Sequence, residues 1–120
     1  MVDTLNATAL TGIRVLDLGQ IYNGSYATMM MAMAGADVIK VEPLRGETLR
    51  GRGPASPSAF AFNFLNQNKR SITVNLKDSR GLALFKRLVP EADVVLENFA
   101  PDTMFVWGFL TISFERSTQN

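Results

Sequence analysis

The sequence predicts an α/β fold in which helices flank a parallel sheet of about four strands. Short apolar runs that suit strands alternate along the chain with longer segments that suit helices. The first strand, helix and strand all fit within residues 14–42. This spacing is typical of a βαβ unit, in which a right-handed crossover makes the two strands parallel.

The first βαβ unit can be divided into elements from its apolar pattern. Residues 14–18 and 37–42 are the two predicted strands. Residues 26–34 carry no charge between them, so we expect a helix that is buried on most sides. Asn23 or Ser25 is the expected N-cap, because short polar side chains accept hydrogen bonds from the first helical turn.

The rest of the chain continues the alternation after a long loop. Residues 45–59 are rich in Gly, Pro and Ser, which favours a loop, and an apolar stretch at 60–65 favours a short helix. Four further elements follow: a strand at 71–76, a helix at 79–89 capped by Asp78, a strand at 92–96 and a helix that begins near Pro101.

The composition excludes several kinds of chemistry. The 120 residues include no His and no Cys, which rules out imidazole catalysis, thiolate catalysis, disulfides and zinc–thiolate sites. A net charge of +1 argues against a nucleic-acid partner. The chain has no apolar run of the roughly 20 residues that span a membrane, and its first residues lack the basic region of a signal peptide. We therefore expect a cytoplasmic protein without metal, nucleic-acid or membrane partners.

The loop after the first strand differs from a dinucleotide fingerprint. Residues 19–25 read Gly-Gln-Ile-Tyr-Asn-Gly-Ser and lack the three glycines of G-x-G-x-x-G. Glu42 nevertheless ends the second strand, where such proteins place their acidic ribose ligand. A nicotinamide-binding module therefore remains an alternative from another functional class. The helix start at Gly24 and Ser25 suits an anion, but it equally suits an ordinary helix N-terminus.

Basic residues are concentrated in residues 40–70. This segment holds six Lys and Arg against two Glu, which gives a net charge of +4 in a chain whose total is +1. Guanidinium groups on a glycine-rich loop are suited to bidentate contacts with phosphate. A solvated basic loop has the same composition, so both interpretations stay open.

Other polar residues have structural explanations. Asp17 lies between leucines inside the first strand, which favours a buried hydrogen-bonding role over a catalytic one. Asn66, Asn68 and Asn98 offer amide donors, although Asn is common in turns for conformational reasons.

Four motifs occur in a specific order along the chain. They are residues 10–18 (LTGIRVLDL), 34–43 (AGADVIKVEP), 68–72 (NKRSI) and 92–99 (ADVVLENF). Together they resemble the N-terminal portion of the family III CoA-transferases, which include formyl-CoA transferase, the carnitine-associated CoA-transferases and α-methylacyl-CoA racemase. The resemblance covers about residues 10–104.

The resemblance implies a fold and an activity. The chain would be the incomplete N-terminal half of a Rossmann-like large domain, over residues 1–104, followed by a divergent tail at 105–120. Members form interlocked homodimers and move CoA from an acyl-CoA to a small carboxylate through an aspartate nucleophile. That aspartate lies beyond residue 120 in the family, so we expect the isolated chain to be inactive as a transferase.

The resemblance also implies which residues meet coenzyme A, and it implies no metal. The loop residues that would line the CoA site are Gln20, Ile21, Tyr22 and Asn23. The candidates for its phosphates are Arg45 and Arg50, and those for its borders are Asn66, Lys69 and Asn98. Two positions depart from the family pattern: Gln20 stands where His is frequent, and Val106 replaces an arginine that often contacts CoA.

Two alternatives to a transferase remain within this interpretation. Racemisation in the same family would also use residues further along the chain. A non-catalytic interaction fragment is the other alternative, and an incomplete sheet would leave an edge and apolar surface uncovered. We therefore expect self-association.

Overall fold

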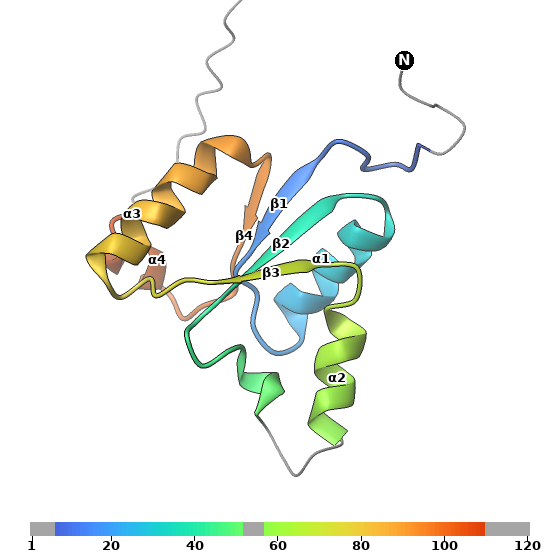
Figure 1. Cartoon of the computed structure of the whole chain (residues 1–120), viewed down its shortest axis with the longest axis horizontal. Helices are drawn as coiled ribbons and strands as arrows, with labels where there is room; N and C mark the ends of the chain where they lie inside the picture. The colour runs from blue at the N-terminus through green and yellow to red at the C-terminus, as the bar shows by residue number, and fades with distance from the viewer. Residues whose placement is uncertain (1–6, 52–56, 110–120) are drawn as a thin grey trace, which may run out of the picture.

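A four-stranded, wholly parallel sheet forms the centre of the molecule (Figure 1). The computed structural model describes residues 7–51 and 57–109. The strands are β1 (Arg14–Asp17), β2 (Asp37–Glu42), β3 (Arg70–Thr73) and β4 (Val94–Leu96), and their order is β3-β2-β1-β4. The predicted α/β class and parallel pairing are confirmed.

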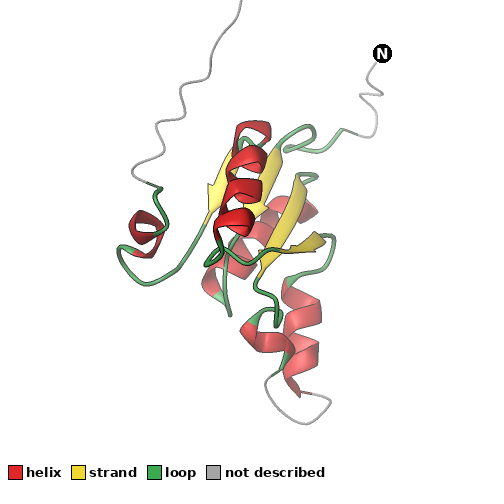
Figure 2. Ribbon diagram, turned by 60° about the vertical axis from the view of Figure 1, so that its left-hand side comes forward, coloured by secondary structure: helices red, strands yellow, loops and turns green. Residues whose placement is uncertain are grey.

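Helices cover both faces of this sheet (Figures 1 and 2). The helices are α1 (Asn23–Met33), α2 (Pro57–Leu65), α3 (Ser79–Leu88) and α4 (Thr103–Val106), with short 3-10 turns η2 (Thr48–Arg50) and η3 (Val89–Glu91). The first two helices lie on one side and α3 on the other. None of the helices in the described ranges is long and apolar enough to cross a bilayer.

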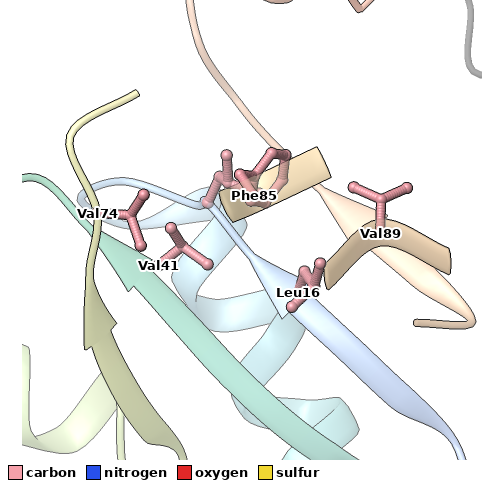
Figure 3. Packing of buried hydrophobic residues seen from close by; sticks show 6 residues of the cluster. Leu16, Val41, Val74, Phe85 and Val89 are labelled. Atoms are coloured by element: carbon pink, nitrogen blue, oxygen red, sulfur yellow. The ribbon is translucent and has the colours of Figure 1, made fainter. Parts of the chain in front are cut away.

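Alternation along β1 divides the core between the two faces. Leu16 packs with Val41 and with Phe85 of α3 (Figure 3). Val15 packs on the opposite face with Ala32 of α1. Because successive strand side chains point to opposite faces, Asp17 falls on the α1 side with Val15. A carboxylate is therefore placed directly under the helix that follows its own strand.

The structure corrects the prediction for the first helix in two respects. Its N-cap is Tyr22 and makes no side-chain cap bond, so Asn23 and Ser25 are not caps. Ser25 lies within the first turn, where its Oγ accepts a hydrogen bond from Lys40 instead. The helix is also less buried than expected, because Met30 and Met33 are about half exposed.

Other boundaries shift by a few residues. The segment predicted as one loop at 45–59 contains η2, and α2 already begins at Pro57. Arg52, part of the basic cluster, and residues 110–120 of the predicted tail lie outside the described residues. The N-cap of α3 is confirmed, since Asp78 accepts a hydrogen bond from the Arg80 amide at 2.9 Å.

Candidate functional site

A pocket of about 400 Å³ opens beyond the carboxyl ends of the parallel strands. Its volume lies in the range of small-molecule sites. In open parallel sheets, ligands bind at this edge and near the point where the strand order reverses, which here lies between β1 and β4. The pocket therefore occupies the position that the fold itself favours for a ligand.

The pocket has an apolar wall and a polar rim. Phe99, after β4, and Trp107, after α4, meet edge to face with ring centroids 5.2 Å apart. Val41, Val74 and Leu76 add aliphatic surface, and Gln20 and Lys77 supply polar groups. The Lys77 side chain is exposed, so a cation stands at the mouth of a largely apolar cavity.

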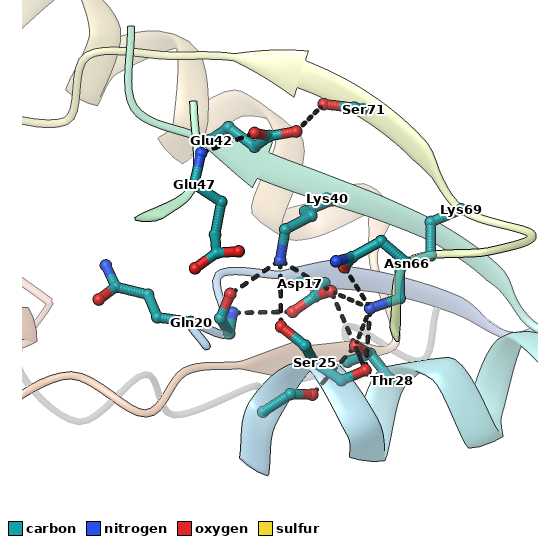
Figure 4. Close-up of polar contacts among 12 residues, drawn as sticks. Asp17, Gln20, Ser25, Thr28, Lys40, Glu42, Glu47, Asn66, Lys69 and Ser71 are labelled. Carbon is teal, nitrogen blue, oxygen red and sulfur yellow. Dashed lines mark hydrogen bonds and ion pairs between the residues drawn. The ribbon is translucent and has the colours of Figure 1, made fainter. Parts of the chain in front are cut away.

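Asp17 organises a buried polar cluster behind the pocket (Figure 4). Its carboxylate is fully buried and accepts hydrogen bonds from the Gly19 amide at 2.7 Å, from Thr28 Oγ1 at 2.7 Å and from Lys69 Nζ at 2.9 Å. Lys40 Nζ lies 3.8 Å away. The expectation that Asp17 is a buried hydrogen-bonding residue is confirmed.

The two lysines of this cluster bind backbone as well as carboxylate. Lys40 Nζ donates to the Gly19 carbonyl at 2.9 Å. Lys69 Nζ donates to the Ser25 carbonyl at 3.0 Å and to Asn66 Oδ1 at 2.9 Å. Burial lowers the pKa of Lys69, and the neighbouring Asp17 opposes that shift. In this arrangement Lys69 and Asn66 face each other and the core.

Asn98 holds the loop between β1 and α1 from the other side. Its Oδ1 accepts from the Gln20 amide at 2.6 Å and its Nδ2 donates to the Gln20 carbonyl at 3.0 Å. Both backbone polar groups of Gln20 are thus bound by one side chain from the end of β4. Gly24 permits this approach, because a Cβ there would lie 3.1 Å from Cγ and Oδ1 of Asn98.

Ile21 adopts a left-handed conformation in the same loop. Its φ is +58°, which is rare for a β-branched residue and costs about 1–2 kcal/mol. The Ile21 amide donates to Glu47 Oε1 at 2.9 Å, and its side chain packs against Leu49 and Phe62. The loop is therefore held in a strained shape by the segment that follows β2.

Glu42 is saturated by hydrogen bonds. Its carboxylate accepts from Arg50 Nε and Nη2, each at 2.7 Å, from Ser71 Oγ at 2.6 Å and from the Glu47 amide at 2.8 Å. Burial alone would raise the pKa of Glu42, but these donors outweigh it and lower the pKa to about 2. An acidic ribose ligand needs free carboxylate oxygens, so this arrangement disfavours the nicotinamide alternative.

The structure separates the predicted site residues into groups. Gln20 lines the pocket, and Ile21 and Asn98 shape its loop. Three others have exposed side chains: Tyr22, Asn23 and Arg45. Three others are engaged within the protein: Arg50 by Glu42, and Asn66 and Lys69 by the Asp17 cluster. Their roles toward CoA stay predictions.

Several pocket residues were not among the predicted ones. Lys77, Phe99, Thr103 and Trp107 line the cavity. Lys77 directly follows the third predicted strand. The rule that ligands bind beyond the carboxyl ends of parallel strands therefore already points to Lys77 as a pocket residue. Thr103 and Trp107 carried no such signal, because only the packing of α4 brings them to the pocket. The described residues contain no group of three or more acidic side chains placed so that they could hold a metal ion.

Comparison with known proteins gives one consistent result. The model of CoA-transferase family III matches residues 10–114. Formyl-CoA:oxalate CoA-transferase of Streptomyces coelicolor is 42% identical, with 88% of this chain and 26% of that protein covered. The alpha subunit of succinyl-CoA–L-malate CoA-transferase of Chloroflexus aurantiacus is 40% identical, with 82% and 24% covered.

A solved structure has the same fold. The crystal structure of hypothetical protein Rv3272 from Mycobacterium tuberculosis superposes with a TM-score of 0.79 at 40% identity. The match covers 85% of this chain and 28% of that one. The chain therefore spans about a quarter of the length of the relatives it matches.

Proposed function

Because this chain belongs to CoA-transferase family III, we propose that its pocket binds the CoA moiety of an acyl-CoA. The observation that carries the proposal is the pocket of about 400 Å³ at the carboxyl ends of the strands. It lies beside the sharply defined loop that the family resemblance relates to CoA. The chain would serve an enzyme that moves CoA from an acyl-CoA to a small carboxylate.

The lining of the pocket suits the two chemical halves of CoA. Phe99 and Trp107 offer faces and edges to the adenine ring or to the pantetheine chain. Lys77 offers its ammonium to a phosphate at the rim, where charge-assisted hydrogen bonds are strong. Arg45 is a second exposed cation on the loop after β2. Arg50 is a weaker candidate, because Glu42 already binds two of its nitrogens.

The transfer chemistry proposed from the family needs a free carboxylate. An aspartate attacks the acyl-CoA carbonyl and expels CoA thiolate, which then attacks the resulting anhydride to give an aspartyl-CoA thioester and the first carboxylate. The acceptor carboxylate repeats these steps in reverse. Among the described residues, Glu42 is the one carboxylate lining the pocket, and its oxygens are saturated. We therefore expect this chain to bind CoA without transferring it.

The relatives favour transfer over racemisation as the activity of the complete enzyme. Both relatives described above are named as CoA-transferases. A homodimer and a cytoplasmic location are further parts of the proposal that rest on the family resemblance and on the sequence.

Isothermal titration of the 120-residue chain with CoA and with NADH tests the proposal. We expect CoA to bind and NADH to give no saturable heat. Lys77→Gln is expected to weaken CoA binding about tenfold, the loss of one charge-assisted contact. Arg87→Gln, at an exposed position of α3 outside the pocket lining, is the matched control and is expected to leave the affinity unchanged.

Two results would contradict the proposal. The first is that the chain binds no CoA, or binds NADH as well as it binds CoA. The second is an unchanged affinity for CoA in Lys77→Gln, which would remove the phosphate role of this lysine. A thioester exchange assay with acetyl-CoA and several carboxylates completes the test, because turnover by the chain alone would contradict its expected inactivity.

A further inference from the structure

We infer that Glu47 is a positioning residue that holds the β1–α1 loop in its CoA-binding shape. It acts through the Ile21 amide, which it binds at 2.9 Å, and so fixes the neighbouring Gln20 at the pocket wall. The inference rests on the proposed function for the identity of the ligand. The geometry of the loop itself stands independently of that ligand.

The loop needs such a residue because its shape is strained. Ile21 has a φ of +58°, where the branched Cβ crowds the backbone. Side chains bind three consecutive amides of the loop: Asp17 binds that of Gly19, Asn98 that of Gln20 and Glu47 that of Ile21. Glu47 therefore stabilises the residue of this loop that has a positive φ and an intrinsically unfavourable conformation.

The Ile21 amide is the hydrogen-bond donor to the Glu47 carboxylate in the described residues, and its other interactions are electrostatic, with Arg50 and Lys69. The residue is 3% exposed, and its Oε2 is buried with no hydrogen-bond partner in the described chain. Burying a carboxylate oxygen in this way is unfavourable for folding. A buried, half-satisfied carboxylate whose hydrogen bond goes to a strained loop is better explained by the loop than by stability.

The segment that carries Glu47 is itself braced. The Glu47 amide donates to Glu42 Oε2 at 2.8 Å, and Arg50 binds both oxygens of the same carboxylate. The Arg50 guanidinium also lies 3.9 Å over the ring of Phe62. Arg50, a phosphate candidate by sequence, thus contributes to the ligand site indirectly, by fixing the turn from which Glu47 reaches Ile21.

Two conservative variants separate the effect of the length of the Glu47 side chain from the effect of its charge. Glu47→Asp keeps the carboxylate but is one methylene shorter, so it no longer reaches the Ile21 amide. Glu47→Gln keeps the length and the accepting oxygen but removes the charge. We expect Glu47→Asp to speed hydrogen exchange of the Ile21 amide and to weaken CoA binding, each about tenfold. Glu47→Gln is expected to stay within about threefold of the original chain in both.

A second pair of variants tests whether strain is the reason. In the Glu47→Asp background, Ile21→Gly removes the penalty for a positive φ, whereas Ile21→Ala shortens the side chain and keeps most of that penalty. We expect the glycine variant to recover CoA affinity and the alanine variant to recover little. Circular dichroism at each step verifies that the variants are folded.

The outcomes distinguish this inference from the proposed function. An unchanged Ile21 exchange rate in Glu47→Asp, or equal losses in the Asp and Gln variants, would overturn the positioning role. Equal recovery by Gly and Ala would overturn strain as its basis. If the original chain binds no CoA, the proposed function fails, and the exchange rates still decide whether Glu47 holds the loop.

Discussion

Asp17 shows how one buried carboxylate can serve several segments at once. It joins β1 to the middle of α1 through Thr28 and to the turn before β3 through Lys69. Lys40 adds a second buried cation next to Asp17. Its hydrogen bond to the Gly19 carbonyl also ties it to the loop between β1 and α1. Removing the carboxylate would leave two buried ammonium groups without their counter-ion.

We predict that Asp17→Asn lowers the free energy of unfolding by about 3–5 kcal/mol, the usual cost of breaking a buried ion pair from one side. Urea denaturation followed by circular dichroism measures it. The control is Asp37→Asn, because Asp37 pairs with Arg14 and Arg70 at the surface and is expected to contribute about 1 kcal/mol or less. Equal effects of the two substitutions would contradict the prediction.

Glu42 makes stability depend on acid pH. Its pKa is about 2 in the folded chain against an ordinary value of 4.5, so the folded state binds the proton less tightly than the unfolded state. The stabilisation is therefore fully present above pH 4.5 and is lost as the pH falls toward 2, and it amounts to at most about 3 kcal/mol. We predict that the difference in free energy of unfolding between the original chain and Glu42→Gln becomes smaller as the pH falls from 4.5 toward 2. A difference that stays constant with pH would exclude this role.

At the scale of elements, α3 packs unusually close to the chain that precedes it. A Cβ added at Gly81 would collide with the backbone carbonyl oxygen of Asn75. The obstruction is backbone, which cannot rotate away as a side chain can. Gly81 therefore sets how closely α3 approaches the segment after β3, which also lines the pocket through Asn75 and Lys77.

We predict that Gly81→Ala destabilises the protein by about 1–3 kcal/mol through overpacking, although Ala favours helices over Gly. Thermal unfolding measures the change. Ala83→Gly, at an exposed position of the same helix, is expected to cost about 0.5–1 kcal/mol from propensity alone. A stabilised Gly81→Ala would mean that α3 can move away from Asn75 without loss.

At the scale of the whole molecule, apolar side chains remain exposed on the α1 and α2 side. Tyr26, Met30 and Met33 follow one another at helical spacing along α1. Phe60 and Phe64 stack on the surface of α2, with ring centroids 6.2 Å apart. Exposed apolar side chains of this kind favour association in water.

We predict that the chain self-associates with increasing concentration and that the double substitution Met30→Glu and Phe64→Glu shifts it toward monomer. Sedimentation velocity over a concentration series measures this. Leu84→Glu, an exposed apolar position on α3, is the control and is expected to leave the association unchanged. A monodisperse monomer at high concentration would contradict the prediction.

The sequence by itself determined the features that depend on local pattern. The alternation of apolar runs sufficed for the α/β class, because period and length distinguish strands from helices. The Asp78 cap and the burial of Asp17 also followed from immediate neighbours in the chain. The CoA-transferase family was recognisable from four short motifs, which family comparison supports over residues 10–114.

Only the tertiary structure decided what the polar side chains bind. Lys69 and Asp17 are 52 residues apart, and Asn98 and Gln20 are 78 residues apart. These contacts follow from the strand order β3-β2-β1-β4, which no local pattern encodes. Basic residues that look equivalent in sequence therefore separate into partners of buried carboxylates, such as Lys69 and Arg50, and cations at the pocket rim, such as Lys77. The physical reason is that burial forces a charge to find a partner, and the fold determines which partner is in reach.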